Sequence, residues 1–83
     1  MSHVTRHDLE ALARQLCECL YGTPDCHIYQ EFEPHGWTWF FTRHVNGQPD
    51  YNNGIPVGGN IQEAEETMRA MMAVCEEKLG KSS

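Results

Sequence analysis

The chain has 83 residues, 40% hydrophobic and 22% charged, and this composition is typical of one globular domain and not of a disordered chain. Twelve acidic and six basic side chains give a formal net charge of −6, which disfavours direct binding to nucleic acid or to an anionic membrane. No apolar run approaches the roughly 20 residues of a membrane span, and the N-terminal residues lack the apolar segment of a secretory signal. We therefore expect a cytoplasmic protein with a single domain over residues 1–83, frayed at residues 1–5 and 81–83.

The first predicted element is an amphipathic helix that begins near Arg6. Thr5 is a suitable N-cap, and Asp8 stands three residues later, where a capping box places an acidic or amide side chain. Leucine and alanine side chains then recur at helical spacing and form one apolar stripe, Leu9, Leu12, Ala13, Leu16 and Leu20. Gly22 favours a left-handed stop at the C-terminus, and Pro24 prevents the helix from resuming.

Two strands joined by a short turn are predicted to follow this helix. Residues 26–33 alternate between two faces, residues 37–45 alternate more regularly, and residues 34–36 contain the proline and glycine of a turn. The pattern predicts an antiparallel hairpin. We expect one face of this hairpin to join the core through four apolar side chains, Ile28, Phe32, Trp39 and Phe41.

The segment after the hairpin combines turn and strand signals. The dipeptide Asn46-Gly47 tolerates positive φ, so a third strand is expected to start near Gln48. Pro49 restricts that strand to an edge of the sheet, and the following residues are rich in Gly, Asn and Pro. We therefore predict that residues 48–59 form a short edge strand plus a loop, and that they are the most mobile ordered segment.

A second amphipathic helix is predicted after Asn60, which is its N-cap, with Glu63 completing a capping box. Gly80 is expected to end it. Its apolar stripe consists of Ile61, Ala64, Met68, Met71, Met72, Cys75 and Leu79. The order α-β-β-(β)-α predicts an α+β fold, a two-layer sandwich in which both helices pack on one face of a small antiparallel sheet.

Four cysteines and five histidines raise the question of a metal or thiol site. Cys17 and Cys19 are two positions apart on a helix, about 200° of rotation, so their side chains diverge and do not form a zinc knuckle. Cys75 lies in an apolar stripe, where it is expected to be a small buried hydrophobe. Cys26 and His27 are neighbours on a strand and point to opposite faces, which disfavours a nucleophilic pair. We therefore expect four reduced thiols, no metal or other cofactor, and no enzymatic activity.

The hairpin face opposite the helices is the candidate functional surface. A two-layer fold of this length should leave that face uncovered, with aromatic rings beside carboxylates. Such a surface suits a protein partner, because the rings supply desolvation energy and the carboxylates steer a basic surface. The expected partner-binding residues are Tyr29, Glu31, Glu33, Phe40, Thr42 and His44.

The sequence thus predicts a small acidic protein-binding module, a regulator or inhibitor of a basic or nucleic-acid-binding protein. Small acidic α+β domains are frequent among phage accessory proteins, so a phage or prophage origin is the base-rate expectation. Two alternatives remain open. One is a zinc- or thiol-dependent protein that uses its Cys and His residues, and the other is a homodimer in which the uncovered faces of two copies pair.

Overall fold

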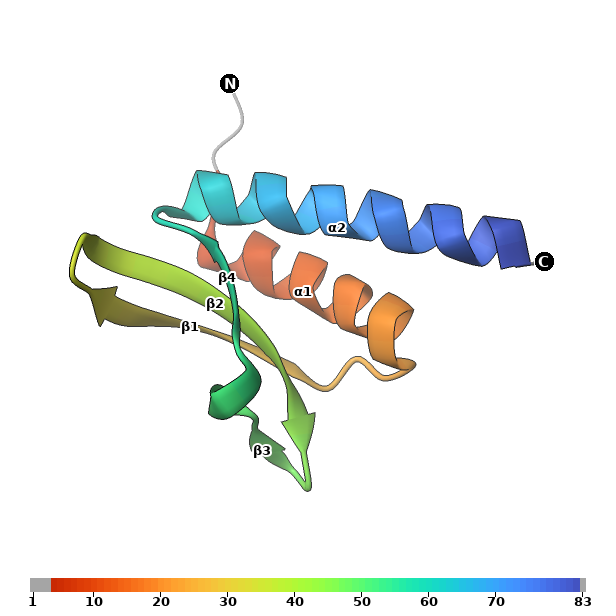
Figure 1. Cartoon of the computed structure of the whole chain (residues 1–83), viewed down its shortest axis with the longest axis horizontal. Helices are drawn as coiled ribbons and strands as arrows, with labels where there is room; N and C mark the ends of the chain where they lie inside the picture. The colour runs from red at the N-terminus through yellow and green to blue at the C-terminus, as the bar shows by residue number, and fades with distance from the viewer. Residues whose placement is uncertain (1–3, 83) are drawn as a thin grey trace.

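The computed structural model describes residues 4–82, and the side chains of residues 4–78. Two helices pack on one face of an open antiparallel sheet, which confirms the predicted two-layer α+β fold (Figure 1). The elements in chain order are α1 (Arg6–Tyr21), β1 (Cys26–Glu33), β2 (Gly36–Val45), β3 (Gln48–Pro49), the 3-10 helix η1 (Tyr51–Asn53), β4 (Ile55–Gly58) and α2 (Ile61–Ser82). Within the described residues, neither helix is long and apolar enough to cross a membrane.

Both helices begin at the predicted caps. The Thr5 hydroxyl accepts a hydrogen bond from the Asp8 N–H, and the Asp8 carboxylate accepts one from the Thr5 N–H, both at 3.1 Å. Gly22 ends α1 in the left-handed conformation, with φ of 78°. At α2, the Asn60 side chain accepts from the Glu63 N–H at 2.9 Å. These local signals account for the start of both helices and for the end of α1.

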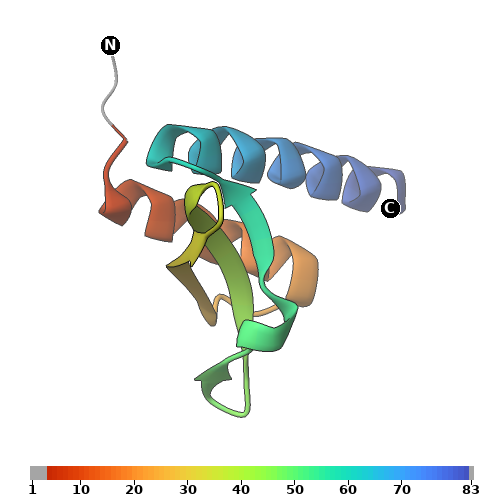
Figure 2. The same cartoon turned by 60° about the vertical axis from the view of Figure 1, so that its left-hand side comes forward.

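The central strand of the sheet is β2. It pairs antiparallel with β1 over eight residue pairs, from Cys26↔Arg43 to Glu33↔Gly36. On its other side it pairs with β4 and, near its end, with the two-residue strand β3. In Figure 2 the helices lie side by side over the sheet, and η1 lies at the end of β4 away from them.

The prediction of a loop up to Gly59 is wrong at residues 55–58, which form β4. Val57 is buried in the core and Ile55 packs against it, while the strand pairs with β2. The sequence does not predict a strand at these residues, because Pro56 and Gly58 lower strand propensity. Pro56 is tolerated because β4 is an edge strand. On the side of β4 that faces away from β2, a missing N–H donor breaks no hydrogen bond to another strand.

The core lies between the helices and the sheet. Its largest fully buried side chains are Leu9, Leu16, Cys17, Phe41 and Met68. Ile28, Trp39 and Phe41 are buried as predicted, but Phe32 is 70% exposed and its place in the predicted core is wrong. The hairpin extends past the N-terminal ends of both helices, so the alternating pattern continues where nothing covers it (Figure 1). Leu20, in the last turn of α1, is also 40% exposed, and the side chain of Leu79 lies outside the described residues.

Gly80 does not stop the second helix, which continues to Ser82. A glycine inside a helix costs only about 1 kcal/mol relative to alanine, which a helix can absorb. Part of the predicted fraying, at residues 1–3 and 83, falls outside the described residues. Thr5 is ordered by its capping bonds, and Lys81 lies within the helix.

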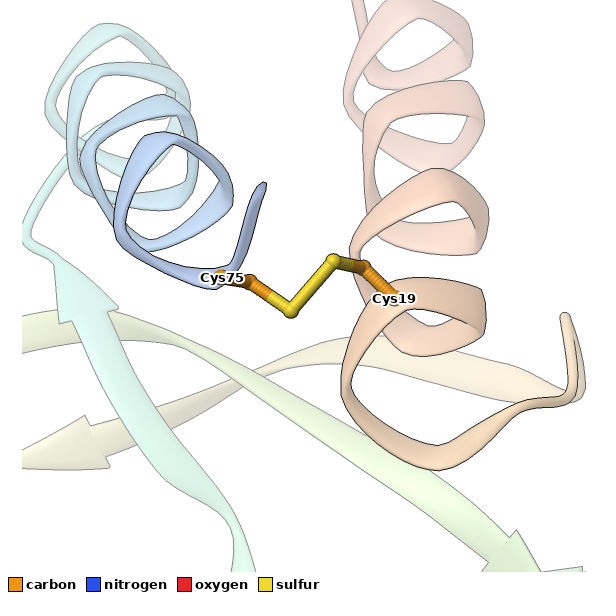
Figure 3. Close-up of a disulfide and its surroundings, with 2 residues drawn as sticks. All are labelled: Cys19 and Cys75. Carbon is orange, nitrogen blue, oxygen red and sulfur yellow. A yellow bond between two sulfur atoms is a disulfide. The ribbon is translucent and has the colours of Figure 1, made fainter. Parts of the chain in front are cut away.

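The expectation of four reduced thiols is wrong, because Cys19 and Cys75 form a disulfide between α1 and α2 (Figure 3). Their Cα atoms are 6.4 Å apart, while the two residues are separated by 56 positions in the sequence. The side chains of Cys17 and Cys19 do diverge: Cys17 is in the core and Cys19 faces the neighbouring helix. Only the packing of α1 beside α2 brings Cys75 within reach, and the helical pattern carries no information about that distance.

Candidate protein-binding surface

Five rings contact one another on the sheet face opposite the helices. We call His27, Tyr29, Phe40, His44 and Tyr51 the ring cluster. The Tyr29 ring stacks on Phe40 with centroids 5.3 Å apart, and Tyr51 meets Tyr29 edge-on at 4.9 Å. His27 stacks beside Tyr29 at 5.8 Å and beside His44 at 6.3 Å. The cluster is therefore one continuous aromatic and imidazole surface.

The strand register brings four of these rings together. Tyr29 is directly opposite Phe40. His27 and His44 lie on the same face, farther from the turn of the hairpin. Tyr51 comes from η1, which the turn at Asn46-Gly47 returns to the sheet. Asn46 and Gly47 both have positive φ, at 55° and 80°, as the sequence predicted for this turn.

The expectation that this face is uncovered is wrong, because η1 and its flanking residues pack on part of it. The Thr42 hydroxyl donates a hydrogen bond to the Asp50 carbonyl at 2.7 Å, and Thr42 is buried. The Asn53 amide donates to the Asp50 carboxylate at 2.9 Å, and this bond links the last residue of η1 to the residue before it begins. Gly54 lies so close to Tyr29 that a Cβ atom there would overlap the tyrosine hydroxyl.

The six residues predicted from the sequence thus have different surroundings. Tyr29, Phe40 and His44 are half-buried members of the ring cluster, and Thr42 is enclosed beneath η1. Glu31 is exposed and Glu33 is half-buried. Both carboxylates follow Tyr29 on the same face of β1. The Tyr51 ring, which the prediction did not include, is 55% exposed and is the most accessible of the cluster.

Burial and nearby charges act on two members of the ring cluster. Burial lowers the pKa of His27, and the neighbouring His44 and Arg6 lower it further, while Glu10 acts in the opposite direction. Burial raises the pKa of Tyr29, and Glu31 adds to this effect. Burial therefore favours the neutral form of both His27 and Tyr29.

A second aromatic pair lies at the turn end of the hairpin. Phe32 and Trp37 are directly opposite each other, and their rings meet edge-on at 5.4 Å. Trp37 is 56% exposed and Phe32 is 70% exposed. The sequence placed Phe32 on the helix side of the sheet and could not show that the helices end before they reach this pair.

The edge of β1 is open within the described residues, since β1 pairs with β2 alone. The His44 N–H donates to the Asp25 carbonyl at 3.0 Å, which identifies Asp25 and His44 as a hydrogen-bonded pair. Hydrogen-bonded and non-bonded pairs alternate in an antiparallel ladder. The backbone groups that point away from β2 therefore belong to Cys26, Ile28, Gln30 and Phe32.

A cavity of about 360 Å³ between α1 and the start of β1 is another place where polar side chains converge. Arg6 lies there, 3.5 Å from the Glu10 carboxylate and over the Trp39 ring at 5.7 Å. Burial raises the pKa of Cys26 to about 11, so this thiol is not poised as a nucleophile. In the part of the chain that the structure describes, no three His, Cys, Asp or Glu side chains are grouped to hold a metal ion.

Comparison of the chain with models of protein families, with curated protein sequences and with solved structures finds no match.

Proposed function

We propose that this chain is a non-enzymatic protein-binding module, a regulator or inhibitor that binds a basic partner on the ring cluster and the adjacent Glu31 and Glu33. The observation that carries this proposal is the contact of five partly exposed rings beside two carboxylates on one sheet face. Stacking holds the rings before any partner arrives, so binding costs little side-chain entropy.

The charge of the chain supports a basic partner. Glu31 and Glu33 stand beside the rings, and the whole chain carries a net charge of −6. Such a field speeds the approach of a basic protein and opposes nucleic acid or an anionic membrane. A basic groove that normally binds nucleic acid would fit this surface, and occupying it would inhibit its owner.

The cytoplasmic expectation rested on the lack of a secretory signal and of a membrane span, and four reduced thiols were its consequence, which the Cys19–Cys75 disulfide contradicts. The proposed binding mode does not depend on the compartment. A homodimer that buries the ring cluster would use the same residues, and the experiment below separates the two cases.

The test uses the intact protein as bait, with captured proteins from source cells identified by mass spectrometry. The main captured protein is then purified and titrated against the wild type and the variant Tyr51→Ala. Tyr51 is a half-exposed ring that makes only edge contacts, so its truncation should spare the fold. If Tyr51 is a hot spot, binding weakens by about 2 kcal/mol, or roughly 30-fold.

The matched charge variants are Glu31→Lys/Glu33→Lys and, as a control, Glu66→Lys/Glu76→Lys on the exposed side of α2. Both pairs change the net charge equally. Only the first should reduce the affinity strongly, because only those carboxylates adjoin the rings. The proposal is wrong if the Tyr51 and Glu31/Glu33 variants both bind like the wild type. Light scattering of the chain alone distinguishes a homodimer, which Tyr51→Ala would dissociate.

A further inference from the structure

Two cysteines lie outside the Cys19–Cys75 disulfide. Cys17 is fully buried near the end of α1, and Cys26 is the partly buried first residue of β1. The connection between α1 and β1, residues 22–25, is short and folds directly from the helix into the sheet. Cys17 and Cys26 therefore lie at the two ends of one tight connection.

The Cys17 thiol lies against the residue that precedes Cys26. The Cys17 thiol donates to the Asp25 carbonyl, with sulfur and oxygen 3.5 Å apart, and Asp25 is the residue before Cys26. Cys26 itself packs against the core cluster to which Cys17 belongs. A cysteine side chain that touches the residue before another cysteine comes within reach of a disulfide once the two side chains turn toward each other.

We propose that Cys17 and Cys26 form a second disulfide, which links the end of α1 to the start of β1. The existing Cys19–Cys75 disulfide indicates that the chain meets an oxidant while it folds. With this bond all four cysteines of the chain are paired, and the oxidised protein has no free thiol. Small domains with modest cores commonly use such cross-links.

The oxidant is a low-molecular-weight disulfide such as glutathione disulfide. The Cys26 thiolate, from the more accessible residue, attacks it, forms a mixed disulfide and releases one glutathione thiolate. The Cys17 thiolate then attacks the Cys26 sulfur, forms the Cys17–Cys26 bond and releases the second glutathione thiolate. The two cysteine protons end on the two released glutathiones, and two electrons pass from the cysteines to the oxidant.

The surroundings of this pair favour a cross-link and not a redox catalyst. Burial is the main cause that raises the pKa of both thiols, with Asp25 adding to the shift at each site. Reactive cysteines need an easily formed thiolate, which burial opposes. We therefore assign bond formation to the folding chain, before Cys17 is enclosed. The finished cross-link would fix the start of β1, directly before His27 of the ring cluster.

The experiment refolds the reduced, unfolded full chain in a buffer of oxidised and reduced glutathione. The product is unfolded again in iodoacetamide, and its intact mass is measured. The proposal expects no alkylation and a mass four hydrogen atoms below that of the fully reduced chain. Alkylation of two cysteines together with a retained Cys19–Cys75 bond would overturn it, and so would alkylation of all four.

Digestion after glutamate followed by cleavage before Asp25 identifies the pairing, because Glu18 separates Cys17 from Cys19 and Asp25 separates Cys19 from Cys26. After the first digestion the proposed bonds link three peptides into one species, residues 11–18, 19–31 and 67–76, and the second cleavage divides it into residues 11–18 with 25–31 and residues 19–24 with 67–76. A Cys17–Cys75 bond with Cys19–Cys26 would link only residues 11–18 to 67–76, and this result contradicts the proposal. The control Cys26→Ser should take up one alkyl group at Cys17, which shows that the reagent reaches Cys17 in the unfolded chain.

Discussion

Gly54 is the residue on which the packing of the ring cluster most directly depends. Its φ of −66° is ordinary for any residue, so the need for glycine comes from space and not from backbone strain. A Cβ atom at this position would overlap the Tyr29 hydroxyl and would lie 3.5 Å from the Phe40 ring. Tyr29 can therefore keep its place against Phe40 only while residue 54 lacks a side chain.

We predict that Gly54→Ala destabilises the protein by about 1–3 kcal/mol, the usual cost of forcing an extra methyl into a packed site. Urea unfolding measures this change. Removing the hydroxyl in Gly54→Ala/Tyr29→Phe should restore part of the loss, since the closest clash is with that oxygen. Equal stability of Gly54→Ala and the wild type would show that η1 does not pack against Tyr29 in solution.

His27 should give the stability of the protein a pH dependence. Its pKa in the folded state is lowered from 6.5, chiefly by burial and secondarily by His44 and Arg6. The unfolded chain therefore binds a proton more readily, and stability falls as the pH drops below about 6.5 toward the folded-state pKa. We expect the wild type to lose more stability than His27→Gln between about pH 7.5 and about pH 5.5 in urea titrations.

The matched control for this prediction is His35→Gln, in the exposed turn of the hairpin. It should retain the pH dependence of the wild type. A pH dependence that is unchanged in His27→Gln and reduced in His35→Gln would contradict the packing described for His27.

At the scale of elements, the sequence predicted what local chemistry determines. The cap at Thr5, the left-handed Gly22 and the hairpin from residue 26 to residue 45 match the structure because their signals lie within a few residues. Strand β4 and the Cys19–Cys75 bond could not be predicted in this way. Both depend on which segments, distant in the sequence, pack side by side. Strand β4, with Pro56, pairs with β2 at the edge of the sheet, and the packing of α2 beside α1 brings Cys75 to Cys19.

The register of β1 makes a position-specific prediction for proline. The Gln30 N–H points away from β2, whereas the Glu31 N–H points toward Thr38 and belongs to the ladder. We therefore expect Gln30→Pro to cost less than about 1 kcal/mol and Glu31→Pro to cost about 3 kcal/mol or more. Thermal and urea unfolding of both variants measure the difference. The reverse order would show that the register is shifted by one residue.

At the scale of the whole molecule, the candidate surface was only partly predictable. The strand alternation placed Tyr29 and Phe40 on the helix-free face, and the structure stacks them there. The alternation could not show that η1 returns to this face, that Thr42 is enclosed by it, or that Tyr51 joins the rings. Those outcomes follow from the path of the chain between β3 and β4, which has no periodic signal.

Charge and the open edge of β1 together determine how the molecule behaves toward its own copies. The edge offers unpaired backbone groups to any second strand, which is a common route to self-association. At neutral pH each chain carries a net charge of −6, so two copies repel each other. The sequence pI is about 5.2, and this repulsion disappears near that pH.

We therefore predict that the protein is monomeric at neutral pH across a dilution series and associates near pH 5.2. Light scattering at both pH values measures the change in mass. Gln30→Pro should suppress the association, because it removes one outward N–H and places a ring on the edge, whereas Gln30→Ala keeps the N–H and should associate like the wild type. Added salt at neutral pH should promote the same association weakly, since it screens the repulsion without removing the charges.

If Gln30→Pro associates as readily as Gln30→Ala, the contact between copies does not use the β1 edge. The ring cluster or the exposed Phe32 and Trp37 would then be the self-association surface.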